Sequence, residues 1–184
     1  PFDGTGWNAS LEACRMALDS LASEAVRFGV LPVEYGEDCR AMQHLLAEGA
    51  VRAIVHTGQA AGSSVVRVEA RAVNLRYAPL GREEAPVAID PAGPPELIAT
   101  LDVLEVTHAI RAAGVPAVVS QHAGIYLCNH VLFRTLQRAH APALFLHLPI
   151  LPIQGGPPNL EVEHSSAAIV ATIRHILATG MAHP

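Results

Sequence analysis

The chain has little charge, few aromatic side chains and few cysteines. Charged residues make up 16% of its 184 residues, aromatic residues make up 4%, and the formal net charge is −5. Because there is no basic excess, the sequence offers no electrostatic footprint for nucleic acid or for an anionic membrane surface. No apolar run approaches the roughly 18 residues that cross a bilayer, and no signal peptide is visible. We therefore expect neither a nucleic-acid partner nor a membrane partner.

The only cysteines are Cys14, Cys39 and Cys128. Their wide spacing gives neither a disulfide framework nor a Cys-x-x-Cys redox pair. Unpaired cysteines are typical of a reducing compartment, so the sequence favours a cytoplasmic protein.

Hydrophobic residues make up 51% of the chain, and strand-like and helical patterns alternate along it. Strands are predicted at residues 26–33, 51–57, 65–75, 115–119 and 143–146. Helices are predicted from Ala9, with Asn8 as the N-cap, and at residues 37–47, 97–113, 129–138 and 165–178. This alternation predicts an α/β fold: a single domain over residues 1–184, with a mixed, mostly parallel sheet and helices on both faces, a three-layer sandwich.

Ligands bind such sheets beyond the carboxyl ends of the strands. Three predicted features meet at that edge: the glycine-bearing loop of residues 58–64, the stretch of residues 120–130, and His147. One hypothesis is a non-catalytic small-molecule-binding domain that uses the glycine-bearing loop as its cradle. The lysine of a Walker phosphate-binding loop is absent, so that loop is weak support.

Cys128 stands where a loop passes into a predicted helix. Free N–H groups and the helix dipole favour a thiolate there, so we expect a lowered pKa and fast alkylation near neutral pH. A cysteine peptidase also needs a histidine that accepts and returns the proton, and a third group that orients the imidazole. His147 and Glu69 are the best candidates for these two roles. The plainer alternative for Glu69 is a solvated strand carboxylate that pairs with Arg67 and Arg71.

A zinc-dependent hydrolase is a further alternative. His122 and His130 flank Cys128, and together with His147 these residues would offer four ligands to zinc. Their spacing matches no established zinc pattern, so we expect no metal.

Five stretches carry a more specific signal. Residues 123–130, Ala-Gly-Ile-Tyr-Leu-Cys-Asn-His, resemble the A-G-T-[FY]-V-C-N-H signature of pyroglutamyl peptidase I, also called pyrrolidone-carboxylate peptidase. The other four are similar to further motifs of that family, in the same order along the chain. They are residues 1–10 (P-F-G-G-x-x-x-N-P-S), 58–62 (G-[LQ]-A-x-G), 69–74 (E-R-[VI]-A-[VI]-N) and 145–152 (F-I-H-[VI]-P-[YF]-x-P).

The resemblance implies a cysteine exopeptidase that hydrolyses the N-terminal pyroglutamyl residue from peptides, with no cofactor. It implies Cys128 as the nucleophile, His147 as the general acid and base, and Glu69 as the acidic partner. It also implies a homo-oligomer, either a dimer or a tetramer.

The resemblance further implies a pocket for the pyrrolidone ring. Phe2 matches an aromatic residue that packs on the ring, Asn8 and Gln59 match polar positions near the pocket, and the backbone around Leu127 would bind the lactam N–H and C=O. A pocket built to pair with the lactam leaves its own polar groups unpaired when proline binds, which gives selectivity.

The chain departs from the family pattern in three places. The family's first strand is not present before Pro1, and we expect that the chain's true beginning is missing from this sequence. Asp3 and Ala9 replace a glycine and a proline, and the segment after Asn74 is shorter and different.

Overall fold

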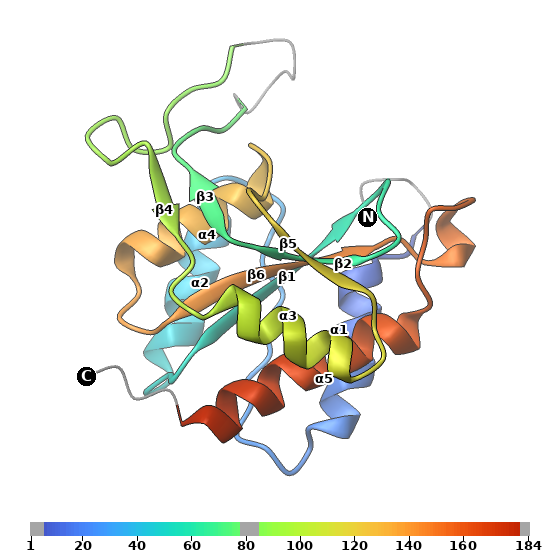
Figure 1. Cartoon of the computed structure of the whole chain (residues 1–184). Coiled ribbons are helices and arrows are strands. Elements are labelled where there is room, and N and C mark those ends of the chain that lie inside the picture. Colours follow the sequence, from blue (N-terminus) through green and yellow to red (C-terminus); the bar gives the residue numbers. More distant parts are fainter. Residues whose placement is uncertain (1–5, 78–84, 181–184) are drawn as a thin grey trace.

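A four-stranded sheet lies at the centre of the computed structural model, which describes residues 6–77 and 85–180 (Figure 1). Its strands are β1 (Ile54–Ala60), β2 (Val66–Glu69), β5 (Ala117–Ser120) and β6 (Ala143–Pro149). Their order is β1-β6-β2-β5, with β1 parallel to β6, β2 parallel to β5, and β2 antiparallel to β6. The sheet is therefore mixed and mostly parallel, as predicted.

Three helices cover one face of this sheet (Figure 1). They are α1 (Ala9–Ser20), α3 (Val103–Ala112) and α5 (Val162–Thr179). Side chains alternate between the two faces of a strand, and Val66, Val68, Leu144, Leu146 and Leu148 all point into the core beneath these helices.

Two helices, α2 (Glu37–Ala47) and α4 (Leu127–Arg138), cover the opposite face. Met42, Leu132, Phe133 and Phe145 form its core. Every residue of β6 is buried, because helices cover the strand on both sides. A small antiparallel sheet of β3 (Arg71–Val73) and β4 (Glu96–Ile98) packs against α4, and a short helix, η1 (Pro152–Gln154), follows β6. The three-layer α/β prediction is confirmed.

No helix within residues 6–77 and 85–180 has the length and apolar character needed to cross a membrane.

The predictions for the first two helices are confirmed. α1 begins at Ala9, and the Asn8 side chain caps it by accepting the backbone N–H of Leu11 at 3.0 Å. α2 has the predicted bounds. α4 begins at Leu127, earlier than predicted, so Cys128 lies inside its first turn.

The predicted strand at residues 26–33 is wrong, since these residues form no strand. Val26 packs against the core under α1, and Leu31 against the core under α2. Val30 and Val33 are exposed. The alternation of apolar residues is strand-like, but a strand also needs a paired edge, and no described segment pairs with these residues.

The single strand predicted at residues 65–75 is two strands in two sheets. The chain passes from one sheet to the other at Ala70: its N–H donates to the Ser120 carbonyl at 2.8 Å, and its own carbonyl accepts the N–H of Ala99 at 2.9 Å. These bonds tie Ala70 to β5 on one side and to the end of β4 on the other.

The helix predicted at residues 97–113 begins only at Val103, because the preceding residues pair in β4 and Asp102 provides the N-cap. The Asp102 carboxylate accepts the backbone N–H groups of Leu104 and Glu105. The remaining elements differ from the predictions mainly in where they begin and end.

Candidate active site

Glu69 and His147 form a buried pair on the face of the sheet that α4 covers. They lie on adjacent antiparallel strands, where Arg67 pairs with His147 and Glu69 pairs with Phe145. His147 Nδ1 lies 2.8 Å from Glu69 Oε1, and the glutamate is fully buried. Because a carboxylate only accepts hydrogen bonds, Nδ1 is the protonated nitrogen, and Nε2 can accept a proton. This is the orientation that a general base needs.

The alternative of a solvated Glu69 is wrong. Its side chain is as buried as those of Val66 and Val68, the apolar residues on the other face of β2. Arg67 Nη2 lies 3.3 Å from Glu69 Oε1 and 2.8 Å from Ser120 Oγ. Within the described part of the chain, Glu69 Oε2 has no hydrogen-bond partner. The charge of Arg67 therefore helps the imidazole to stabilise this buried carboxylate.

Cys128 Sγ lies beside the strand that carries His147. Gly58 of β1 pairs in register with His147, and a Cβ placed on Gly58 would lie 3.0 Å from Cys128 Sγ and 2.7 Å from Phe145 Cζ. Phe145 and His147 point to the same face of β6, with their ring centroids 4.6 Å apart. The structure therefore brings Cys128, His147 and Glu69 to one face of the sheet. Glycine at position 58 leaves the space that the thiol occupies.

The thiol of Cys128 does not have the lowered pKa that its helix position predicted. Its pKa is raised to about 11: burial raises it most, the Cys128 backbone N–H lowers it, and the negative charge of Glu69 raises it. Desolvation disfavours a thiolate more strongly than the helix N-terminus favours it. The resting group is therefore a thiol, and it needs a base before it can attack.

Asn129 fixes the first turn of α4 to the small sheet, a role that the sequence analysis missed. Its side-chain N–H groups donate to the carbonyls of Val73 and Leu75 at 2.8 and 2.9 Å, and its Oδ1 accepts the N–H of Val73 at 2.9 Å. The residue is fully buried. The sequence did offer one indication of this role, because Asn129 directly follows Cys128 within the motif of residues 123–130.

The four predicted ring-pocket residues have different positions. Phe2 lies outside the described residues. Asn8 caps α1, and Gln59 Oε1 accepts the N–H of Ala9 at 2.9 Å, so both are hydrogen-bonded at the start of that helix. Leu127 is buried as the first residue of α4. Contact between these residues and a substrate stays a prediction.

Comparison with known proteins agrees with this geometry. The profile of the family described as pyroglutamyl peptidase matches residues 1–179. The chain belongs to the pyroglutamyl peptidase family. Pyrrolidone-carboxylate peptidase 1 of Ralstonia nicotianae is 34% identical over 192 residues, which cover 97% of this chain and 88% of the relative. Pyrrolidone-carboxylate peptidase of Cupriavidus pinatubonensis is 34% identical over 194 residues, which cover 99% of this chain and 89% of that relative.

Solved structures of pyrrolidone carboxyl peptidases share the fold. A mutant of the Pyrococcus furiosus protein superimposes with a TM-score of 0.83 at 26% identity, over 97% of this chain and 95% of that one. The pyrrolidone carboxyl peptidase of Fervidobacterium islandicum gives a TM-score of 0.81 at 28% identity, over 97% of this chain and 94% of that one. The chain is therefore a cysteine hydrolase of the pyroglutamyl-peptidase type, as the sequence resemblance implied.

The zinc alternative gains no support in this pyroglutamyl peptidase. Within the described ranges, the one group of three or more potential ligands whose atoms lie within 4.8 Å of one another is Asp38, Cys39 and His130. His122, Cys128, His130 and His147 are thus not gathered into one site. Asp38 Oδ2 lies 2.7 Å from His130 Nδ1, and Asp38 Oδ1 accepts the N–H of Cys39 at 2.7 Å. These bonds explain that cluster as a connection between α2 and α4.

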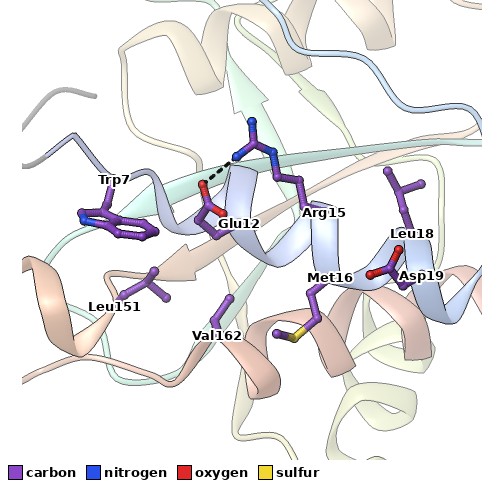
Figure 2. Close-up of a pocket in the computed structure, with 8 residues that line it drawn as sticks. All are labelled: Trp7, Glu12, Arg15, Met16, Leu18, Asp19, Leu151 and Val162. Carbon is purple, nitrogen blue, oxygen red and sulfur yellow. Dashed lines mark hydrogen bonds and ion pairs between the residues drawn. The ribbon is translucent and has the colours of Figure 1, made fainter.

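The glycine-bearing loop predicted at residues 58–64 does not begin at Gly58. β1 continues to Ala60, so Gly58 lies inside the strand and not in a ligand-binding loop. A groove of about 520 Å³ exists elsewhere, beside α1 (Figure 2). It is lined by Trp7, Glu12, Arg15, Met16, Leu18, Asp19, Leu151 and Val162. None of the three gathered residues lines it, so this groove is separate from the candidate active site.

Proposed function

We propose that this chain releases the N-terminal pyroglutamyl residue from peptides, with Cys128 as nucleophile, His147 as general acid and base, and Glu69 as the orienting carboxylate. The observation that carries the proposal is the buried Glu69–His147 hydrogen bond on the strand next to the space occupied by Cys128 Sγ. A nucleophile, a base and an orienting group are the parts that acyl transfer requires.

In the first step, the thiol proton of Cys128 passes to His147 Nε2, and Sγ attacks the carbonyl carbon of the pyroglutamyl residue. The thiol pKa of about 11 makes this transfer necessary, since little thiolate is present at neutral pH without it. Glu69 stabilises the imidazolium that forms. Backbone N–H groups at the start of α4 would stabilise the oxyanion, because the first N–H groups of a helix lack partners within the helix.

In the second step, the imidazolium gives its proton to the leaving amine, and the carbon–nitrogen bond breaks to leave a thioester on Cys128. A water molecule then loses a proton to His147 Nε2 and attacks the thioester. The carbon–sulfur bond breaks, pyroglutamate is released, and His147 returns the proton to Sγ to restore the thiol. No metal or organic cofactor takes part in this scheme.

Selectivity would come from the ring pocket. We propose that Phe2 packs on the ring, that Asn8 and Gln59 shape the polar wall, and that the backbone around Leu127 pairs with the lactam. A free, charged N-terminal amine would lose its hydration in this site, which disfavours ordinary peptides.

The assignment is tested by replacing each cysteine in turn. We expect Cys128→Ala to lower the release of pyroglutamate from a pyroglutamyl amide by at least about a thousandfold, because the nucleophile is lost. Cys14→Ala and Cys39→Ala are the matched controls and should retain most activity, as should wild-type protein treated with EDTA. Full activity in the Cys128 variant would exclude the mechanism.

We also propose a cytoplasmic location and assembly into a dimer or tetramer. The three free cysteines support the first proposal, because they fit a reducing compartment. The family resemblance supports the second, and light scattering coupled to gel filtration measures it directly.

A further inference from the structure

Tyr35 lies at the end of α4 that carries Cys128. Its ring packs edge-on against Tyr126, with centroids 6.1 Å apart, and edge-on against His130, with centroids 5.0 Å apart. Tyr126 and His130 stand two residues before and two residues after Cys128. The tyrosine therefore adjoins the proposed catalytic centre although it lies far from Cys128 in the sequence.

The phenol oxygen of Tyr35 is buried and has no hydrogen-bond partner among residues 6–77 and 85–180. A buried hydroxyl without a partner destabilises a protein relative to a paired one. A phenylalanine would keep the ring contacts without that penalty. The hydroxyl is therefore best explained by a partner that arrives with the substrate.

The surroundings of Tyr35 keep the hydroxyl protonated. Burial raises the pKa of the phenol, and Tyr126, Asp38 and Cys128 raise it further. The Arg76 guanidinium, 4.6 Å above the ring, has the opposite effect but does not reverse the shift. At neutral pH Tyr35 is thus a neutral donor, and it lies within electrostatic reach of Cys128.

The position of the nucleophile limits which substrate oxygen this donor could meet. Successive helix residues are rotated by about 100°, so His130 points to a different side of α4 from Cys128. Cys128 Sγ faces Gly58 and the sheet, whereas Tyr35 packs on His130 and Tyr126. The scissile carbonyl must lie at Sγ. The second carbonyl of a pyroglutamyl residue is the one in its ring, and it is the substrate acceptor left for a donor that does not face Sγ.

We propose that Tyr35 is a specificity-determining residue whose O–H donates a hydrogen bond to the ring carbonyl oxygen of the pyroglutamyl group. The inference rests on the proposed function. A proline ring has no oxygen at that position, so its binding would leave the phenol unpaired. Tyr35 thus adds a side-chain donor to the backbone groups proposed near Leu127.

The test compares wild type with Tyr35→Phe, using direct calorimetric binding of free pyroglutamate and hydrolysis of a pyroglutamyl amide. We expect the Kd for pyroglutamate and the KM to rise by about 10- to 100-fold, with kcat changed by less than about threefold, because the bond is made in the ground state and in the transition state alike. Inhibition by cyclopentanecarboxylate, which has the ring and carboxylate but no ring carbonyl, should stay within about threefold of wild type. The midpoint of thermal unfolding should stay equal or rise, and Tyr77→Phe serves as the matched loss of a tyrosine hydroxyl.

Unchanged pyroglutamate affinity in Tyr35→Phe would overturn the inference. So would an equal loss of affinity for pyroglutamate and for cyclopentanecarboxylate, or a lowered midpoint of thermal unfolding. Because binding is measured apart from hydrolysis, the two proposals can fail separately. A wild type that binds pyroglutamate but releases none contradicts the proposed function, whereas a variant that binds as wild type does contradicts only the role of Tyr35.

Discussion

Glu69 has two opposite effects on the residues around it. Through its bond to His147 Nδ1 it holds the imidazole and favours the imidazolium that catalysis needs. Through its charge it raises the pKa of the Cys128 thiol. The same carboxylate therefore promotes proton transfer to His147 and opposes the free thiolate, which links attack by sulfur to acceptance of its proton by the base.

Glu69→Gln separates these two effects. Removing the charge should lower the pKa of Cys128, so alkylation of this thiol by iodoacetamide, followed by mass spectrometry, should be faster at pH 8 than in wild type. Hydrolysis should nevertheless fall by about a hundredfold or more, because the imidazolium loses its ion partner. Glu96→Gln, which removes a carboxylate paired with Arg71 outside the site, is the control.

A different result in wild type would change this account. If alkylation of Cys128 already reaches a plateau near neutral pH, a thiolate–imidazolium pair exists in the resting protein, and Glu69 does not oppose ionisation. A rate that continues to rise above pH 9 supports the raised pKa.

At the scale of single residues, the sequence identified the chemistry but not the environment. Cys128, His147 and Glu69 could be selected from residue type, motif and position. The direction of the Cys128 pKa shift could not, because it depends on how much protein covers the thiol, and that is set by α4, β1 and β6 together. The burial of Glu69 was missed for the same reason.

At the scale of elements, the position of the nucleophile depends on how α4 is attached. Among the residues that the structure describes, no side-chain hydrogen bond caps this helix, whose N-cap is Tyr126. Asn129 provides the attachment instead, through three hydrogen bonds to the backbone of β3 and the residues after it. The helix that carries Cys128 is thus fixed by the residue next to it.

Asn129→Ala should therefore affect both stability and activity. It removes the hydrogen-bond partner of two carbonyls and one N–H, so we expect the free energy of unfolding to fall by about 2–4 kcal/mol in urea titrations. A displaced first turn should also lower kcat for the pyroglutamyl amide. Gln43→Ala, on the exposed side of α2, is the control. An unchanged unfolding free energy would show that these bonds do not hold the helix.

Elements were predictable where the signal is local and were missed where it is not. The Asn8 cap and the bounds of α2 follow from nearby residues, and both predictions were right. The strand at residues 26–33 and the undivided strand at residues 65–75 were wrong because pairing depends on distant partners. Ala70, for example, changes sheets through bonds to Ser120 and Ala99, which no local pattern contains.

At the scale of the whole molecule, the layer formed by α2 and α4 encloses a histidine that catalysis does not use. His56 on β1 is buried, stacks on Phe145 at 6.1 Å between centroids, and lies 2.8 Å through Nε2 from Thr135 Oγ1 on α4. Its pKa is lowered to about 4, because burial lowers it more than the charge of Asp38 raises it. The folded protein therefore holds this imidazole neutral under conditions in which an unfolded chain would protonate it.

The stability of this layer should then depend on pH in a defined direction. An unfolded histidine titrates near pH 6.5, so between pH 6.5 and 4 the unfolded chain binds the proton and the folded chain does not. The stabilisation is complete above pH 6.5 and is lost as the pH falls towards 4, by roughly 2–3 kcal/mol between pH 7 and 4.5. Urea titrations at these two pH values measure the loss. His56→Gln should remove most of the difference, whereas His44→Gln, an exposed histidine of α2, should retain it.

Because Asp38 has a pKa held below its usual range by its hydrogen bond to His130 despite its burial, that group stays ionised over this interval. A wild-type loss that persists in His56→Gln would therefore assign the acid sensitivity to a different group and show that His56 is accommodated in its protonated form.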